Sequence, residues 1–97
     1  MNRIYGVHDI KSQSLVGGLV MFRHDAAAIR YFIDGLNHQG SLTNLHPEDF
    51  ALYHLGHLID PDEDQPNDPL PYIDPCTPQL ILSGAQWVAS QPSPEDA

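Results

Sequence analysis

The residues best suited to chemistry lie in one stretch, residues 46–64, which reads HPEDFALYHLGHLIDPDED. This stretch holds three histidines, six carboxylates and no basic residue, so the chemistries to consider are metal binding and general acid–base catalysis. His54 and His57 are three positions apart, which puts them on opposite faces of a strand; only on a helix would they share a face. No HExxH or CxxC motif accompanies them. Polar or boundary positions explain these histidines more simply, and we expect no metal site.

The aspartates that follow alternate as they do in a calcium-binding loop. Asp60, Asp62 and Asp64 have the required spacing. The sixth position of such a loop needs glycine but is Gln65, and the twelfth needs glutamate but is Pro71. We therefore expect no Ca²⁺ site in this segment.

The single cysteine, Cys76, would be a catalytic nucleophile only with a histidine partner beside it. Pro75 and Thr77-Pro78 predict that this cysteine lies in a loop, without the turn that exposes a nucleophile. Gly17-Gly18 lacks the spacing of a phosphate-binding loop. The sequence therefore predicts a protein that is not an enzyme and that uses no cofactor.

Charge is divided unevenly along the chain. The 97 residues carry a formal net charge of −9, which repels nucleic acid on average. All four basic residues lie in the first thirty positions, whereas 11 of the 13 carboxylates lie beyond them. Two interpretations stay open at this point. Either the protein presents a weakly basic face on an acidic body, or acidic loops maintain its solubility and the cations share no role.

A helix is predicted over residues 25–37, DAAAIRYFIDGLN. Asp25 suits the start of this helix because of the helix dipole, and Gly40 is placed to end the segment. Tyr31 is expected at the boundary of the buried side. The apolar positions that follow one helical stripe are Ala26, Ile29, Phe32, Ile33 and Leu36.

The other apolar runs predict strands. Residues 2–8 and 15–22 are expected to pair as a hairpin, with Gly17-Gly18 marking a bulge. Pro47 begins a short helical turn. Residues 50–59 fit a helix, with Leu52, Leu55, Leu58 and Ile59 on one side, or a strand, and Gly56 with the aromatic content favours the strand.

The second half of the chain is rich in proline. Residues 60–71 contain four prolines and five acids and predict a loop. Tyr72-Ile73 is predicted as a short returning strand. Pro75 and Pro78 then break the chain before an apolar closing segment, residues 79–89.

These elements predict an α+β fold, a small antiparallel sheet of three to four strands with one main helix packed on it. Residues 1–90 are expected to form a single globular domain, and residues 91–97 a disordered tail. A core this small favours self-association, so we expect a homo-oligomer. One cysteine and the lack of a membrane-spanning apolar run indicate a soluble protein of a reducing compartment.

Two segments carry a family resemblance. One has the pattern D-x-x-A-x-R-x-F from Asp25 to Phe32, and the other reads HPEDFALYHLG from His46 to Gly56. Over roughly residues 2–90 the chain resembles the small nonstructural protein of gokushoviruses, the microvirus subfamily with single-stranded circular DNA genomes. It departs at Gly17-Gly18, where relatives often carry prolines, and in its longer acidic loop.

The resemblance implies a non-enzymatic phage protein in the host bacterial cytoplasm. Such a protein would act in viral DNA synthesis, or in the switch toward single-stranded genome production and packaging.

Three hypotheses about its partner follow. In the first, the protein binds single-stranded DNA or a replication-complex protein, through phosphate contacts and base stacking. In the second, it is an acidic adaptor or DNA mimic that docks on a basic host or phage protein. In the third, it is a homo-oligomeric assembly factor with Gly17-Gly18 or a sheet edge at its interface. The residues assigned to nucleic-acid binding are Arg3, Lys11, Arg23, Arg30, Tyr5 and Tyr31, with Phe22 as a further stacking candidate. The residues assigned to the acidic alternative are Asp62, Glu63 and Asp64.

Overall fold

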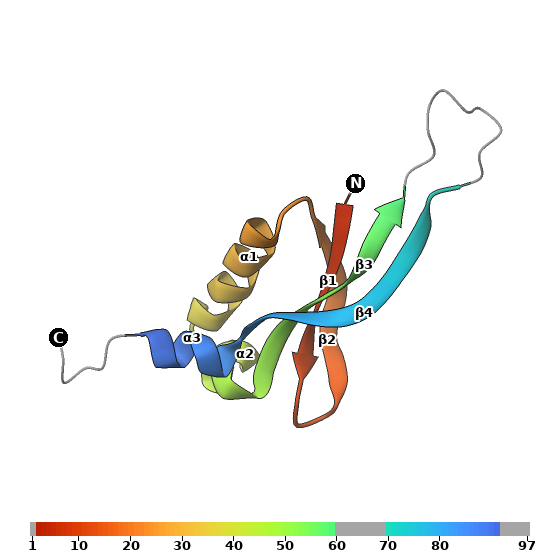
Figure 1. The fold of residues 1–97 in the computed structure, drawn as a ribbon. Coiled ribbons are helices and arrows are strands. Elements are labelled where there is room, and N and C mark those ends of the chain that lie inside the picture. The colour runs from red at the N-terminus through yellow and green to blue at the C-terminus, as the bar shows by residue number, and fades with distance from the viewer. Residues whose placement is uncertain (1, 60–69, 92–97) are drawn as a thin grey trace.

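The computed structural model describes residues 2–59 and 70–91. Its strands are β1 (Asn2–Asp9), β2 (Ser14–Phe22), β3 (Phe50–Ile59) and β4 (Tyr72–Ser83). Its helices are α1 (Asp25–Asn37), α2 (Leu42–Leu45) and α3 (Gly84–Ser90), with a 3₁₀ turn η1 (Pro47–Asp49). The strands form one antiparallel sheet in the order β2-β1-β3-β4, and α1 lies against one side of it (Figure 1). The predicted α+β fold is confirmed. Among these residues, no helix has the length and apolar character needed to cross a membrane.

Helix α1 has the predicted bounds, but the row of side chains that it buries differs from the predicted stripe. Ala28, Phe32 and Leu36 are buried, whereas Ala26 is exposed. The buried residues follow an i, i+4 row, which forms a continuous ridge on a helix. The small side chain of Ala28 lets this end of α1 approach the sheet closely. The ridge packs on Tyr5, Phe50 and Leu52.

The predicted bulge at Gly17-Gly18 is confirmed. Tyr5 pairs with Val20 and Val7 pairs with Val16, so three residues of β2 stand opposite the single Gly6 of β1. Gly17 has a φ of +68°, a left-handed conformation that glycine adopts without steric cost. The bulge therefore ends regular pairing in the middle of β2, an edge strand.

The predicted returning strand does begin at Tyr72, but its predicted short length is wrong because the prolines do not break it. The strand runs without interruption through Pro75 and Pro78 to Ser83. β4 forms an edge of the sheet, where a residue without an N–H is tolerated. Its pairing with β3 also shifts register beside Pro75. Local sequence signals missed this because they do not reveal that the strand is at an edge.

The predicted closing segment, residues 79–89, is divided between the end of β4 and α3. The division occurs at Ser83, whose side chain accepts a hydrogen bond from the Gln86 N–H while the Gln86 side chain accepts one from the Ser83 N–H. This reciprocal pair is a capping box and starts the helix. Trp87 of α3 then packs against the core.

The junction between α3 and η1 has no room for a side chain at Gly84. A Cβ atom there would lie 1.6 Å from the carbonyl oxygen of Pro47. The predicted helical turn at Pro47 is confirmed as η1. The predicted acidic loop lies outside the described residues except for its end at 70–71, and the predicted tail lies outside them except for Gln91.

We predict that Gly84→Ala lowers the free energy of unfolding by about 2–4 kcal/mol, because the backbone of Pro47 must move to admit the methyl group. Urea denaturation followed by Trp87 fluorescence measures this loss. Gly18→Ala is the matched control, since no atom lies within 4 Å of a Cβ at Gly18. If the free energy of unfolding of Gly84→Ala lay within about 0.5 kcal/mol of that control, the junction between α3 and η1 would have room for a methyl group, which would contradict the close contact.

Candidate nucleic-acid interface

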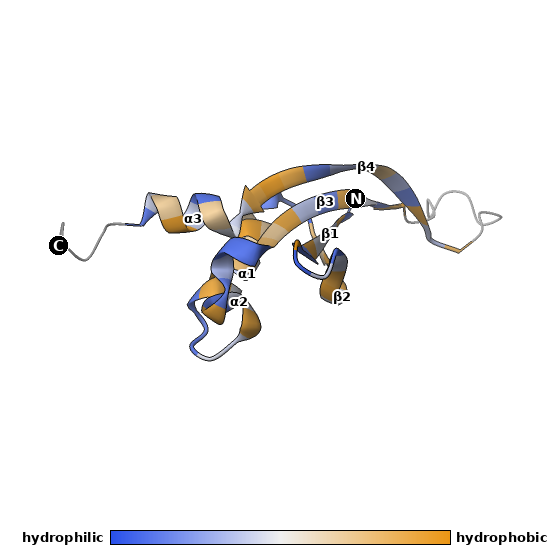
Figure 2. Ribbon diagram, turned by 90° about the horizontal axis from the view of Figure 1, so that it is seen from below, coloured by the Kyte–Doolittle hydropathy of each residue, from blue (hydrophilic) through white to orange (hydrophobic). Residues whose placement is uncertain are grey.

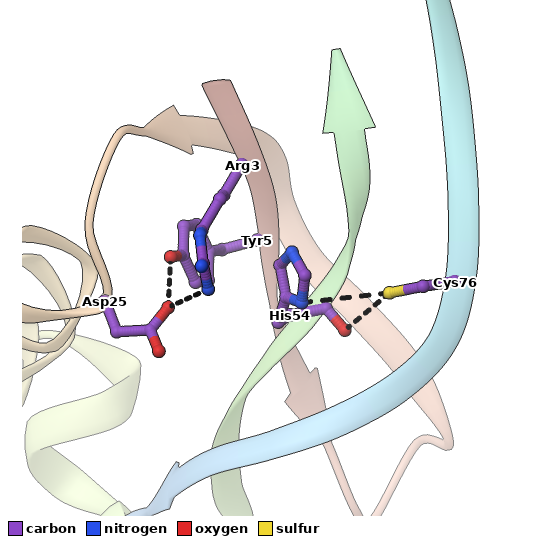
Figure 3. Close-up of polar contacts among 5 residues, drawn as sticks. All are labelled: Arg3, Tyr5, Asp25, His54 and Cys76. Atoms are coloured by element: carbon purple, nitrogen blue, oxygen red, sulfur yellow. Dashed lines mark hydrogen bonds and ion pairs between the residues drawn. The ribbon is translucent and has the colours of Figure 1, made fainter. Parts of the chain in front are cut away.

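A polar cluster fixes the start of α1 to the centre of the sheet. The hydroxyl of Tyr5 on β1 donates a hydrogen bond to Oδ1 of Asp25, the first residue of α1, at 2.5 Å. Arg3 donates to the same oxygen through Nη1 at 3.2 Å (Figure 3). Asp25 therefore receives two donors from one strand. Tyr5 and Asp25 are twenty residues apart in sequence, and their hydrogen bond sets the position at which α1 begins.

The surroundings of Tyr5 stabilise its neutral form. The pKa of Tyr5 is raised to about 12, mainly by burial and also by the hydrogen bond to Asp25 and the charge of that carboxylate, against a smaller opposing effect of Arg3. The side chain is completely inaccessible to solvent. The prediction that Tyr5 stacks on a base is therefore wrong, because the ring is part of the core.

Arg3 is only partly available to a phosphate. Its side chain is 42% exposed, as is that of Asp25, and their ion pair already neutralises its charge. A phosphate at Arg3 would have to compete with a carboxylate that the protein holds in place. Arg3 therefore contributes more to positioning α1 than to binding.

The outer side of α1 carries a shallow hollow of about 500 Å³, which we call the α1 hollow. Its wall includes an aromatic pair, Phe22 and Tyr31, whose ring centroids are 5.7 Å apart at an interplanar angle of 47°. Tyr31 is 46% exposed, so one part of its ring is free to stack. The residues that line the hollow are Phe22, His24, Ala26, Ala27, Arg30, Tyr31 and Asp34.

Two cations adjoin these rings. Arg30 lines the α1 hollow, and Arg23 lies in the turn that leads from Phe22 into α1. Both are exposed, and neither forms an ion pair within residues 2–59 and 70–91. Asp34, one turn after Arg30, places one carboxylate at the rim. The hollow thus combines a stacking surface with one arginine and one carboxylate, and Arg23 in the preceding turn adds one positive charge near it.

Lys11 does not belong to this group. It lies in the turn between β1 and β2, at the opposite end of the hairpin from Arg3 (Figure 1). Its backbone N–H donates to the side chain of Asp9 at 2.9 Å. The four cations therefore do not form one patch, since only Arg3, Arg23 and Arg30 lie near the start of α1.

The residues of the acidic alternative, Asp62, Glu63 and Asp64, lie outside the described residues. Seven of the 13 carboxylates fall in residues 60–69 and 92–97, whereas all four cations fall in the described part. The described part alone therefore has a formal charge of −2.

His54 and His57 lie on the same face of β3, and the prediction of opposite faces is wrong. Tyr5 of β1 pairs with His54 and the neighbouring Ile4 pairs with Gly56, so Leu55 is an extra residue in β3. This bulge turns the two imidazoles toward each other, with ring centroids 4.9 Å apart. Sequence spacing alone assumes regular alternation and cannot reveal the bulge.

Cys76 lies in β4, not in the predicted loop, and its Sγ is 3.7 Å from Nδ1 of His54 (Figure 3). His54 is only 4% exposed, and its Nε2 has no hydrogen-bond partner among residues 2–59 and 70–91. The contact joins β4 to the buried side of β3. In the part of the chain that the structure describes, no three His, Cys, Asp or Glu side chains are grouped to hold a metal ion.

Comparison with known proteins identifies one family. The model of the family described as Phage ORF5 protein matches residues 2–87. The search of curated proteins and the search of solved structures each found no match.

We predict that the stability of the protein falls more steeply above pH 10 than that of Tyr5→Phe. Because the pKa of Tyr5 is about 12 when folded and near 10 when unfolded, the unfolded chain loses its proton first as the pH rises. The Tyr5 contribution is therefore complete below pH 10 and declines between pH 10 and 12, by at most about 1.4 kcal/mol per pH unit. Urea denaturation of both proteins across this range measures the difference. If the free energies of unfolding of the two proteins changed with pH in parallel, the buried hydrogen bond from the Tyr5 hydroxyl to Asp25 would be contradicted.

Proposed function

The chain belongs to the Phage ORF5 protein family, and from this premise we propose that it binds single-stranded DNA weakly, or a replication-complex protein that carries such DNA. We propose further that it is a non-enzymatic, nonstructural protein of a gokushovirus-like phage. In the host cytoplasm it would act in viral DNA synthesis or in the switch to single-stranded genome production and packaging. The α1 hollow is the observation that supports this proposal most directly.

The hollow suits an unpaired base better than a duplex. Tyr31 offers an exposed ring beside Phe22, and a base can stack on such a ring only when it has left a double helix. Stacking on an aromatic side chain contributes about 1–3 kcal/mol per base without demanding a particular sequence. In this proposal Arg30 and Arg23 contact the phosphates on either side of that base.

The small number of cations sets the expected strength. Two free arginines neutralise about two phosphates, so the logarithm of the binding constant should fall with the logarithm of salt concentration at a slope near −1.4. Such binding is weak at physiological salt for one copy of the protein. It becomes useful where the genome is long and many copies bind side by side, or where the protein self-associates.

We predict that Arg23→Ala with Arg30→Ala weakens binding to a labelled single-stranded oligonucleotide by at least about tenfold at low salt and removes most of the salt dependence. Fluorescence anisotropy at low and at physiological salt measures both quantities, with duplex DNA as a comparison. Lys11→Ala is the matched control, because it removes one positive charge at the far end of the β1–β2 hairpin. An equal loss for Lys11→Ala and for either single arginine variant would indicate general charge attraction only.

We predict that Tyr31→Ala lowers affinity for the single strand by about 1–3 kcal/mol and leaves the salt slope unchanged, because it removes stacking and no charge. Tyr72→Ala is its control, since Tyr72 is also exposed, at 57%, but lies on β4, outside the α1 hollow. Fluorescence anisotropy titrations with the same labelled single-stranded oligonucleotide measure both affinities. An affinity for Tyr31→Ala equal to that of wild type would exclude the hollow as a stacking site.

A further inference from the structure

The face of the sheet turned away from α1 presents no charged side chain within the described strands. The charged residues of β1, β2, β3 and β4 are Arg3, Asp9 and Asp74. Arg3 and Asp9 share the side of Tyr5 by alternation along β1. Asp74 stands opposite His57 in the β3–β4 ladder, on that same side. The second face, which we call the helix-free face, therefore carries no Lys, Arg, Asp or Glu on the described strands.

The helix-free face is also apolar and open. Five aliphatic side chains on it have exposed fractions from 45% to 57%, namely Leu15, Leu19, Met21, Ile73 and Leu80. Between them, Tyr53 and Leu55 are half-buried and help to line a hollow of about 350 Å³. Figure 2 shows apolar segments along β3 and β4 that alternate with hydrophilic ones.

From this face we infer that the protein forms a symmetric dimer in which the helix-free faces of two copies pack against each other. Charge points to a second copy as the occupant. Copies with a net charge of −9 repel each other least where neither presents a carboxylate. On the described strands of this face a basic partner finds no carboxylate and a nucleic acid finds no cation, so the complementary surface is apolar and uncharged. The same surface on a second copy meets that condition, as a two-fold interface requires.

The available area is sufficient for such a contact. Five aliphatic side chains at about half exposure present on the order of 500 Å², which already equals a large apolar patch on a monomer. The half-buried side chains between them bring the face toward the ~800 Å² per partner that specific complexes bury. Two sheets packed in this way place their core about 10 Å thick between the two copies.

Pairing through the sheet edges is the less favourable route. β4 carries Pro75 and Pro78, and β2 is interrupted by the bulge at Gly17 and Gly18. Prolines and bulges are both features that prevent an edge strand from pairing with another chain. We therefore assign the contact between copies to the helix-free face. The bulge at Gly17-Gly18 hinders pairing of β2 with a strand of another copy.

The dimer does not depend on DNA binding, and its test uses no DNA. In the assembly, each α1 hollow lies on the side of its own sheet that faces away from the partner copy. Two hollows on one particle would double the number of phosphate contacts and raise the affinity for a long strand.

Sedimentation equilibrium of the full chain, from about 1 to 100 μM, tests the inference. Wild type is expected to sediment at twice the monomer mass within this range. Met21→Glu with Leu80→Glu should raise the dissociation constant of the dimer at least about 100-fold, because each copy would bring two unpaired carboxylates into an apolar contact. The matched control is Leu42→Glu with Leu45→Glu, since these leucines of α2 are exposed by 56% and 62% but lie off the sheet. It should remain dimeric.

Two results would overturn the inference. One is wild type that stays monomeric at 100 μM, and this result needs no variant to fold. The other is a Met21/Leu80 variant that dimerises as tightly as wild type while its circular dichroism spectrum is unchanged. The milder pair Met21→Ser with Leu80→Ser repeats the test should the glutamates prevent folding, and it too must weaken the dimer.

Discussion

The hydrogen bond from Tyr5 to Asp25 is the contact on which the arrangement of the protein depends. It joins the middle of the central strand β1 to the first residue of α1, so the helix can begin at only one place above the sheet. Every side chain of the α1 hollow that follows Asp25 takes its direction from that starting point. The ridge of Ala28, Phe32 and Leu36 then holds the rest of the helix on the core. The candidate interface lies on the solvent side of α1, and the hydrogen bond between Tyr5 and Asp25 determines how the buried side of α1 is placed on the sheet.

The two sides of the sheet have different physical character. The α1 side contains all the charged residues of the described strands and the polar cluster around Asp25. The helix-free side of the described strands contains solvent-exposed aliphatic and aromatic side chains and none of these charged residues. The separation suits the two proposed contacts, one with a phosphate backbone and one with a second copy of the protein, since the charged and apolar surfaces do not interfere.

Local periodicity was enough to predict α1, which has a continuous pattern over 13 residues. For β3 the periodicity fitted a helix as well as a strand, and Gly56 and the aromatic content favoured the strand that the structure has. Periodicity failed where structure depends on the neighbouring strand. Pro75 and Pro78 are compatible with β4 only because that strand is at an edge, and the position of His57 depends on a bulge opposite β1. The pairing of Tyr5 with Asp25 has no sequence signal at all. For the same reason the stacking role was assigned equally to Tyr5 and Tyr31, although one is buried and the other exposed.

The most direct test of the α1 hollow is to record amide chemical shifts of ¹⁵N-labelled protein as an unlabelled single-stranded oligonucleotide is added at low salt. Binding through the hollow predicts that the largest shifts fall on residues 22–34, with little change on β4. Shifts concentrated on the β1–β2 turn, or spectra that do not change at millimolar DNA, would contradict the proposed interface.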